Sequence, residues 1–100
     1  MDQRKVSLWE TGYTDLESIE AYIAQDSLTI ARNFISLIFD RIERLANYAE
    51  SGKVVREFNN QNIRELLLKK YRIVYQIISE EEVVVLRIVH SSRLLDLDIE

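Results

Sequence analysis

Apolar residues recur every three or four positions in the first half of the chain, as they do on the buried face of a helix. The first such series is Leu16, Ile19 and Ile23. Thr14 and Glu17 fit a capping box, because a hydroxyl and a carboxylate can satisfy the free amides of a first helical turn. The pattern therefore predicts a helix that ends near Gln25, preceded by a turn at Gly12 and a strand over Lys5–Trp9.

A second and longer apolar series follows after a short polar connection. Its members are Ala31, Ile35, Ile38, Ile42, Leu45 and Ala49, with Phe34 and Phe39 widening the stripe. Asp26 or Ser27 is expected to cap this helix, and Gly52 is expected to stop it in a left-handed conformation. Two helices joined so closely predict an antiparallel hairpin.

Beyond Gly52 the period changes from helical spacing to alternation, which predicts strands. The expected strands are residues 54–58, 63–68, 71–79 and 82–90. A two-residue turn at Glu80 and Glu81 would pair Val74 with Arg87 and place Arg87 on the same sheet face as Arg72. A shift of one residue would reverse that face.

These elements predict an α+β fold: an N-terminal strand, an α-helical hairpin, and an antiparallel meander packed under the helices. With 100 residues the chain is expected to form one domain, residues 1–100. Little chain is left to cover the far face of the sheet, so that face is expected to be an open binding surface. The residues expected to form it are Arg64, Arg72, Arg87, His90 and Arg93.

Composition excludes several kinds of chemistry. Cysteine is absent and histidine occurs once, so no metal site and no cofactor are predicted. The chain has no signal-like N-terminus and no apolar run long enough for a membrane, which predicts a cytoplasmic protein. The formal net charge is −4, yet residues 53–93 hold eight Lys and Arg against five Asp and Glu. This distribution permits a local basic groove but argues against binding of nucleic acid through bulk charge.

Cleavage of RNA without a metal ion is the enzymatic reaction that the residues allow. Because an imidazole titrates near neutrality, His90 can act as base or acid, while Arg72, Arg87 and Arg93 can hold a phosphate. A structural alternative stays open for each group: His90 at a strand end, Arg64 paired with Glu57, and Arg87 paired with a glutamate. The aromatic residues that follow the apolar period are expected in the core. They are Tyr22, Phe34, Tyr71 and Tyr75.

An ordered set of short motifs spans nearly the whole chain. It runs from Trp9, Asp15-Leu16, Tyr22-Ile23 and Gly52 to Ile63-Arg64-Glu65-Leu66, Tyr71-Arg72-Ile73-Val74-Tyr75, Leu86-Arg87-Ile88-Val89-His90 and Arg93. In this order the motifs resemble the RelE/ParE superfamily of toxins from bacterial type II toxin–antitoxin systems. The fold implied by the resemblance, two helices over an antiparallel sheet, agrees with the fold predicted from the pattern.

The resemblance implies one of two activities. RelE-like members cut messenger RNA on the ribosome, and their strand lysines fall at Ile63 and Glu65, which cannot replace them. ParE-like members poison DNA gyrase, and their HGxR ending resembles His90–Arg93, with Ser91 in place of the usual glycine. A ParE-like gyrase inhibitor, which is not itself an enzyme, is therefore favoured. In the nuclease alternative Arg72, His90 and Arg93 would be catalytic.

Further expectations follow from the resemblance alone. A cognate antitoxin is expected to neutralise the toxin, and a homodimer or a toxin–antitoxin heterotetramer is implied. An inactive relic that only binds its antitoxin is the third alternative. Two alternatives stay open for the tail, residues 94–100: a terminal helix like that of some relatives, or masking of the arginine-bearing face by Asp96, Asp98 and Glu100.

Overall fold

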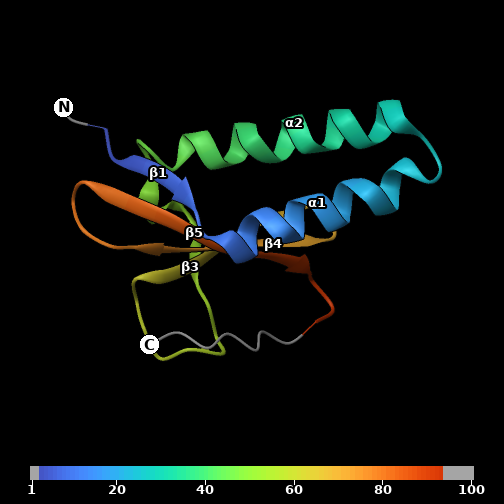
Figure 1. The fold of residues 1–100 in the computed structure, drawn as a ribbon. Coiled ribbons are helices and arrows are strands. Elements are labelled where there is room, and N and C mark those ends of the chain that lie inside the picture. Colours follow the sequence, from blue (N-terminus) through green and yellow to red (C-terminus); the bar gives the residue numbers. More distant parts are fainter. Residues whose placement is uncertain (1–2, 94–100) are drawn as a thin grey trace.

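A mixed five-stranded sheet lies beneath a helical hairpin in this computed structural model, which describes residues 3–93 (Figure 1). In chain order the elements are β1 (Lys5–Leu8), α1 (Glu10–Ala24), α2 (Leu28–Arg44), a 3₁₀ turn (Ala49–Ser51), β2 (Lys53–Val54), β3 (Ile63–Leu68), β4 (Tyr71–Ile77) and β5 (Glu82–His90). The strand order is β1-β5-β4-β3-β2, with β1 parallel to β5 and the other neighbours antiparallel. The predicted α+β fold is confirmed. The predictions for residues 94–100 lie outside the described residues.

The second helix begins where the sequence predicts, because the Ser27 side chain accepts a hydrogen bond from the Ile30 amide at 3.2 Å. The capping box predicted at Thr14 is wrong, since α1 already begins at Glu10. Gly12 does not turn the chain but lies buried inside α1, where an added Cβ would stand 3.2 Å from the Val85 carbonyl oxygen. Glycine thus lets the helix approach the sheet closely.

Gly52 does not adopt the predicted left-handed conformation, because its φ is −75°. The helix α2 instead ends at Arg44, before a 3₁₀ turn. Gly52 is needed for space: a Cβ there would lie 2.5 Å from the Tyr75 hydroxyl oxygen. The Tyr75 hydroxyl accepts a hydrogen bond from the Gly52 amide and donates one to the Ala49 carbonyl at 2.6 Å.

The main core lies between the helices and the near face of the sheet. Its buried helical residues are Leu16, Ile19, Phe34, Ile38, Ile42 and Leu45, and its buried strand residues include Ile73, Tyr75, Val83, Val85 and Ile88. Val85 and Ile88 are three residues apart, which simple alternation forbids on one face. A bulge between Val74 and Tyr75 in the register explains this: Val74 pairs with Arg87 as predicted, whereas Tyr75 pairs with Val85.

The far face of the sheet is not bare, and the prediction of an open arginine-bearing face is wrong. A second apolar cluster covers it, formed by Val55, Ile63, Val74, Val84, Leu86 and Val89 with Phe58 against them. The predicted strand over residues 54–58 is reduced to Lys53–Val54. The following segment turns back over the sheet and buries Val55 completely. Burial of these side chains is favourable, so the segment covers apolar surface that water would otherwise meet.

Candidate functional site

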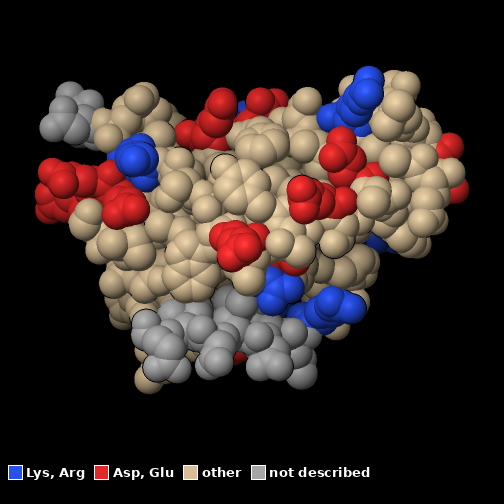
Figure 2. Space-filling model, in the orientation of Figure 1, with Lys and Arg blue, Asp and Glu red and all other residues tan. Residues whose placement is uncertain are grey.

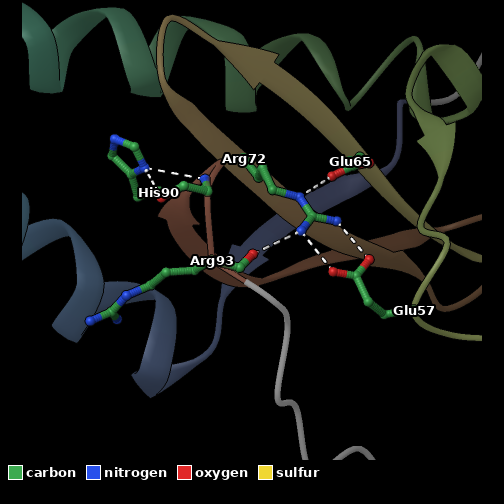
Figure 3. Close-up of polar contacts among 6 residues, drawn as sticks. Glu57, Glu65, Arg72, His90 and Arg93 are labelled. Atoms are coloured by element: carbon green, nitrogen blue, oxygen red, sulfur yellow. Dashed lines mark hydrogen bonds and ion pairs between the residues drawn. The ribbon is translucent and has the colours of Figure 1, made fainter.

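Arg72 on β4 is buried in a cluster of carboxylates (Figure 3). Its Nε donates to Glu65 on β3, and its two terminal nitrogens donate to the Glu57 carboxylate at 2.9 Å each. A further bond runs from Arg72 to the Arg93 carbonyl oxygen at 3.3 Å. The hydrogen bonds to Glu57 raise the pKa of Arg72 above its ordinary value, although burial opposes this. The guanidinium is therefore held by the protein's own acidic groups.

A polar cavity of about 540 Å³, here called the Arg72 cavity, opens beside this cluster. It is lined by Lys53, Arg56, Glu57, Glu65, Leu67, Arg72, Ser91, Ser92 and Arg93. Glu57 and Glu65 reduce the positive charge of the cavity wall. Both bind Arg72, which is buried, whereas the other arginines of the lining, Arg56 and Arg93, are exposed.

A second hollow of about 570 Å³ lies between α1 and the end of β5 and is called the α1–β5 groove. It exists because β1 pairs with β5 only as far as Val85. Beyond that point side chains of α1 replace the missing strand: the Thr11 hydroxyl donates to the Leu86 carbonyl at 2.8 Å, and Asp15 accepts from the Ile88 amide at 2.9 Å. This arrangement ties the helix to the strand edge.

The Arg87 side chain lies in this groove and does not line the Arg72 cavity. Its Nε donates to Asp15 at 2.7 Å, and these bonds to Asp15 raise the pKa of Arg87 despite partial burial. Arg87 pairs with Val74 as predicted, yet its side chain binds Asp15 of α1, whereas Arg72 binds Glu57 and Glu65. The partner of Arg87 is an aspartate from the helix instead of a glutamate.

His90 closes β5 at the same groove, with its ring edge against Tyr71 at a centroid distance of 5.6 Å. Its Nδ1 accepts a hydrogen bond from the Ser92 amide at 3.2 Å and lies 2.8 Å from the Ser92 hydroxyl. The Ser92 backbone and hydroxyl thus both engage Nδ1.

The predicted site residues are thus divided between two places. Arg87, His90 and Arg93 line the α1–β5 groove, whereas Arg72 and Arg93 line the Arg72 cavity. Figure 3 shows the Arg93 backbone beside Arg72 and its side chain running away toward α1. Arg64 lines neither place, because it donates to the carbonyls of Gln61, Glu50 and Gly52. The alternative pair of Arg64 with Glu57 is wrong, since Glu57 binds Arg72.

The sequence interpretation missed three features of these sites. Asp15 was not expected near Arg87, although Asp15, Ser18 and Tyr22 follow one side of a helix at spacings of three and four. Lys70 was not connected with the groove because it belongs to the β3–β4 turn. Tyr22 was expected in the core, but 69% of its surface is exposed.

Within residues 3–93, no three His, Cys, Asp or Glu side chains are grouped so that they could hold a metal ion. None of the helices in that part of the chain is both long and apolar enough to cross a membrane.

The fold is similar to that of chains in three solved structures. The chromosomal ParDE system of P. aeruginosa gives a TM-score of 0.71 at 19% identity, over 88% of this chain and 96% of that one. The RelBE2 toxin–antitoxin complex of Mycobacterium tuberculosis gives 0.63 at 20% identity, over 90% and 99%. The E. coli DinJ-YafQ complex gives 0.53 at 9% identity, over 90% and 96%. A search of curated protein sequences found no significant match.

Comparison of the sequence with models of protein families gives a more specific result. Residues 13–95 match the family model described as the ParE toxin of the type II toxin–antitoxin system parDE. The chain belongs to the ParE toxin family, and the resemblance to the RelE/ParE superfamily is confirmed.

Proposed function

We propose that this toxin inhibits DNA gyrase and that a cognate antitoxin neutralises it. Membership of the ParE family supports the first part, since the ParE-like branch is the one whose resemblance implies gyrase poisoning. The similarity of the fold to chains from three toxin–antitoxin systems supports the second part.

The observation that carries the choice of gyrase over messenger RNA is the state of Arg72. Cleavage of RNA without metal needs cations that are free to stabilise a pentacovalent phosphate. Arg72 already binds two carboxylates, and one of them, Glu65, stands where the resemblance places a lysine of the nucleases. A phosphate would have to displace both glutamates and would then meet their charge.

His90 gives a second reason to disfavour the nuclease. A general base needs an unprotonated nitrogen that faces the substrate. In His90 the Nδ1 atom is already engaged by the amide and the hydroxyl of Ser92.

A gyrase assay tests the proposal directly. Purified toxin is incubated with gyrase and relaxed plasmid, and the products are separated after the protein is removed. We expect accumulation of linear DNA and loss of supercoiling that grow with toxin concentration. Undisturbed supercoiling at large toxin excess would contradict gyrase inhibition.

A reconstituted translation reaction separates the alternatives. New cuts in the translated message, reduced by Arg93→Gln, would identify a nuclease. Arg93 is exposed and its side chain makes no bond within the described residues, so this variant should stay folded. Activity in neither assay, together with antitoxin binding, would identify the inactive relic.

The proposed antitoxin site is an apolar hollow of about 580 Å³ at the tip of the helical hairpin. It is lined by Ile23, Ile30, Asn33, Phe34, Leu37, Lys69, Lys70 and Tyr71. Ile30 is 60% exposed beside the hollow, and two lysines stand at its margin. These features fit the apolar face of an amphipathic helix flanked by acidic residues.

Substitution of Ile30→Asp should weaken the complex with the antitoxin by about tenfold or more, because it places a charge in an apolar contact. The antitoxin is sought as the product of a small acidic reading frame beside the toxin gene. The matched control is Tyr48→Asp, another large exposed apolar residue that does not line this hollow. Equal affinities of both variants, measured by titration calorimetry, would place the antitoxin elsewhere.

A further inference from the structure

The α1–β5 groove holds two positive charges that no acidic side chain of the described chain neutralises. Arg87 and Asp15 form an ion pair and cancel each other. Lys70 and Arg93 line the same groove, both are exposed, and neither forms an ion pair with any residue of the stretch 3–93. Figure 2 shows a small group of Lys and Arg side chains below the acidic side chains on this face of the molecule.

The side chains of the groove are mostly donors. The Lys70 ammonium and the Arg93 guanidinium offer several N–H groups. Such donors match an anion with several acceptor oxygens. The exposed ring of Tyr22 lies on the helical wall among these cations. Cations beside an exposed aromatic ring are the usual composition of surfaces that bind nucleic-acid strands.

An added peptide strand fits the groove poorly, although its floor is the edge of β5. The Ile88 amide is already bound by Asp15, and the His90 carbonyl accepts from the Arg93 amide at 3.0 Å. Addition of a strand requires a row of free backbone groups. Recognition in the groove therefore depends on side chains.

We propose that the α1–β5 groove binds the phosphodiester backbone of DNA, with a base or sugar against Tyr22. The inference rests on the proposed function, because gyrase presents cleaved DNA to its inhibitor. Lys70 and Arg93 contact phosphate oxygens, and the Arg87–Asp15 pair keeps the groove wall in place. Since the net charge of the chain is −4, binding to free DNA is weak and depends strongly on salt.

Fluorescence anisotropy with a labelled single-stranded oligonucleotide tests the inference on the whole chain. Binding at low salt should weaken with a logarithmic salt slope of about −1.4, as expected for two phosphate contacts on a single strand. The double variant Lys70→Gln/Arg93→Gln should bind about tenfold less tightly or worse. Its matched control is Arg32→Gln/Arg44→Gln, which removes two exposed cations of α2 that do not line the groove. Circular dichroism checks that both variants are folded.

Equal affinities of the two double variants, or no binding by the original protein at low salt, would overturn the inference. Tighter binding of a labelled polyglutamate peptide than of the oligonucleotide would also overturn it, and would identify an acidic protein segment as the ligand. The gyrase assay distinguishes failure of this inference from failure of the proposed function. Gyrase trapping without DNA binding removes only this inference, whereas DNA binding without an effect on gyrase removes the proposed function.

Discussion

Arg72→Met is the substitution whose effect the structure predicts most directly. Methionine keeps much of the volume of the side chain but removes the guanidinium that binds Glu65 and Glu57. The Glu65 side chain is only 6% exposed, so water cannot replace the lost cation. The Glu57 side chain is 21% exposed and can turn partly toward solvent.

The expected loss follows from this difference in burial. Removal of one partner from a buried ion pair typically costs about 3–5 kcal/mol, because the remaining charge is uncompensated. A domain of this size is usually stable by about 5–15 kcal/mol, so the variant loses a large part of its stability. Glu57→Gln should cost only about 1 kcal/mol, because Arg72 keeps Glu65 and the change occurs at the more exposed partner.

Urea unfolding followed by circular dichroism measures these differences. The double variant Arg72→Met/Glu65→Leu should regain most of the lost stability, since it removes the buried charge as well as its partner. Arg56→Met is the control, because this exposed arginine lines the same cavity and forms no ion pair among residues 3–93; its effect should stay within about 0.5 kcal/mol. A loss below about 1 kcal/mol for Arg72→Met, or no recovery in the double variant, would refute the reasoning.

Three further predictions concern the contacts that fix the sheet. Asp15→Ala should lower the free energy of unfolding in urea by about 2–3 kcal/mol, because the Arg87 side chain and the Ile88 amide both lose their acceptor. Asp15→Asn should lower it by only about 1 kcal/mol, since the side-chain oxygen of asparagine can still accept from the Ile88 amide. Equal losses in the two variants would contradict this role of Asp15. Burial raises the pKa of Tyr75 above its ordinary value of 10.0. The neutral hydroxyl therefore stabilises the fold fully at pH values below the pKa of the unfolded state, and this contribution is lost as the pH rises through the pKa of the folded state. Tyr75→Phe should therefore show a smaller loss of stability between about pH 9 and about pH 11 than the original protein, and an unchanged loss would remove Tyr75 from the alkaline transition. Gly52→Ala should lower thermal stability by about 2–3 kcal/mol, because the added Cβ would lie 2.6 Å from the Glu65 carbonyl oxygen. Gly12→Ala should change it by less than about 1 kcal/mol, since the better helix propensity of alanine offsets the 3.2 Å contact with the Val85 carbonyl oxygen. Equal effects of the two substitutions would show that neighbouring atoms move to relieve the contacts.

The predicted helices and strands agree with the structure where each face of an element meets a single environment, either the core or the solvent. The stripe of α2 and the strands Ile63–Leu68 and Glu82–His90 have periodic patterns that tertiary contacts reinforce. The predictions failed at glycine and at the cap of α1, where the same residue types serve different purposes. Gly12 and Gly52 both provide space for close packing, which cannot be distinguished from a turn without knowing the neighbour.

The site was less predictable than the fold because its geometry depends on residues distant in the chain. The cationic residues were recognised as a set, but Arg72 and Arg87 bind different carboxylates and line different hollows. The carboxylates that bind them, Asp15 and Glu57, are 72 and 15 residues away in sequence. No local pattern reports such pairs.

The sequence by itself determined the class of fold and the family, because both are written in the order of apolar positions and short motifs along the chain. Tertiary structure alone decided which arginines remain free. Charge pairing depends on distance in space, and a cation held in an ion pair within a poorly hydrated cluster is not available to a ligand. Arg72 and Arg87 are held in this way, whereas Lys70 and Arg93 form no ion pair with any residue between 3 and 93.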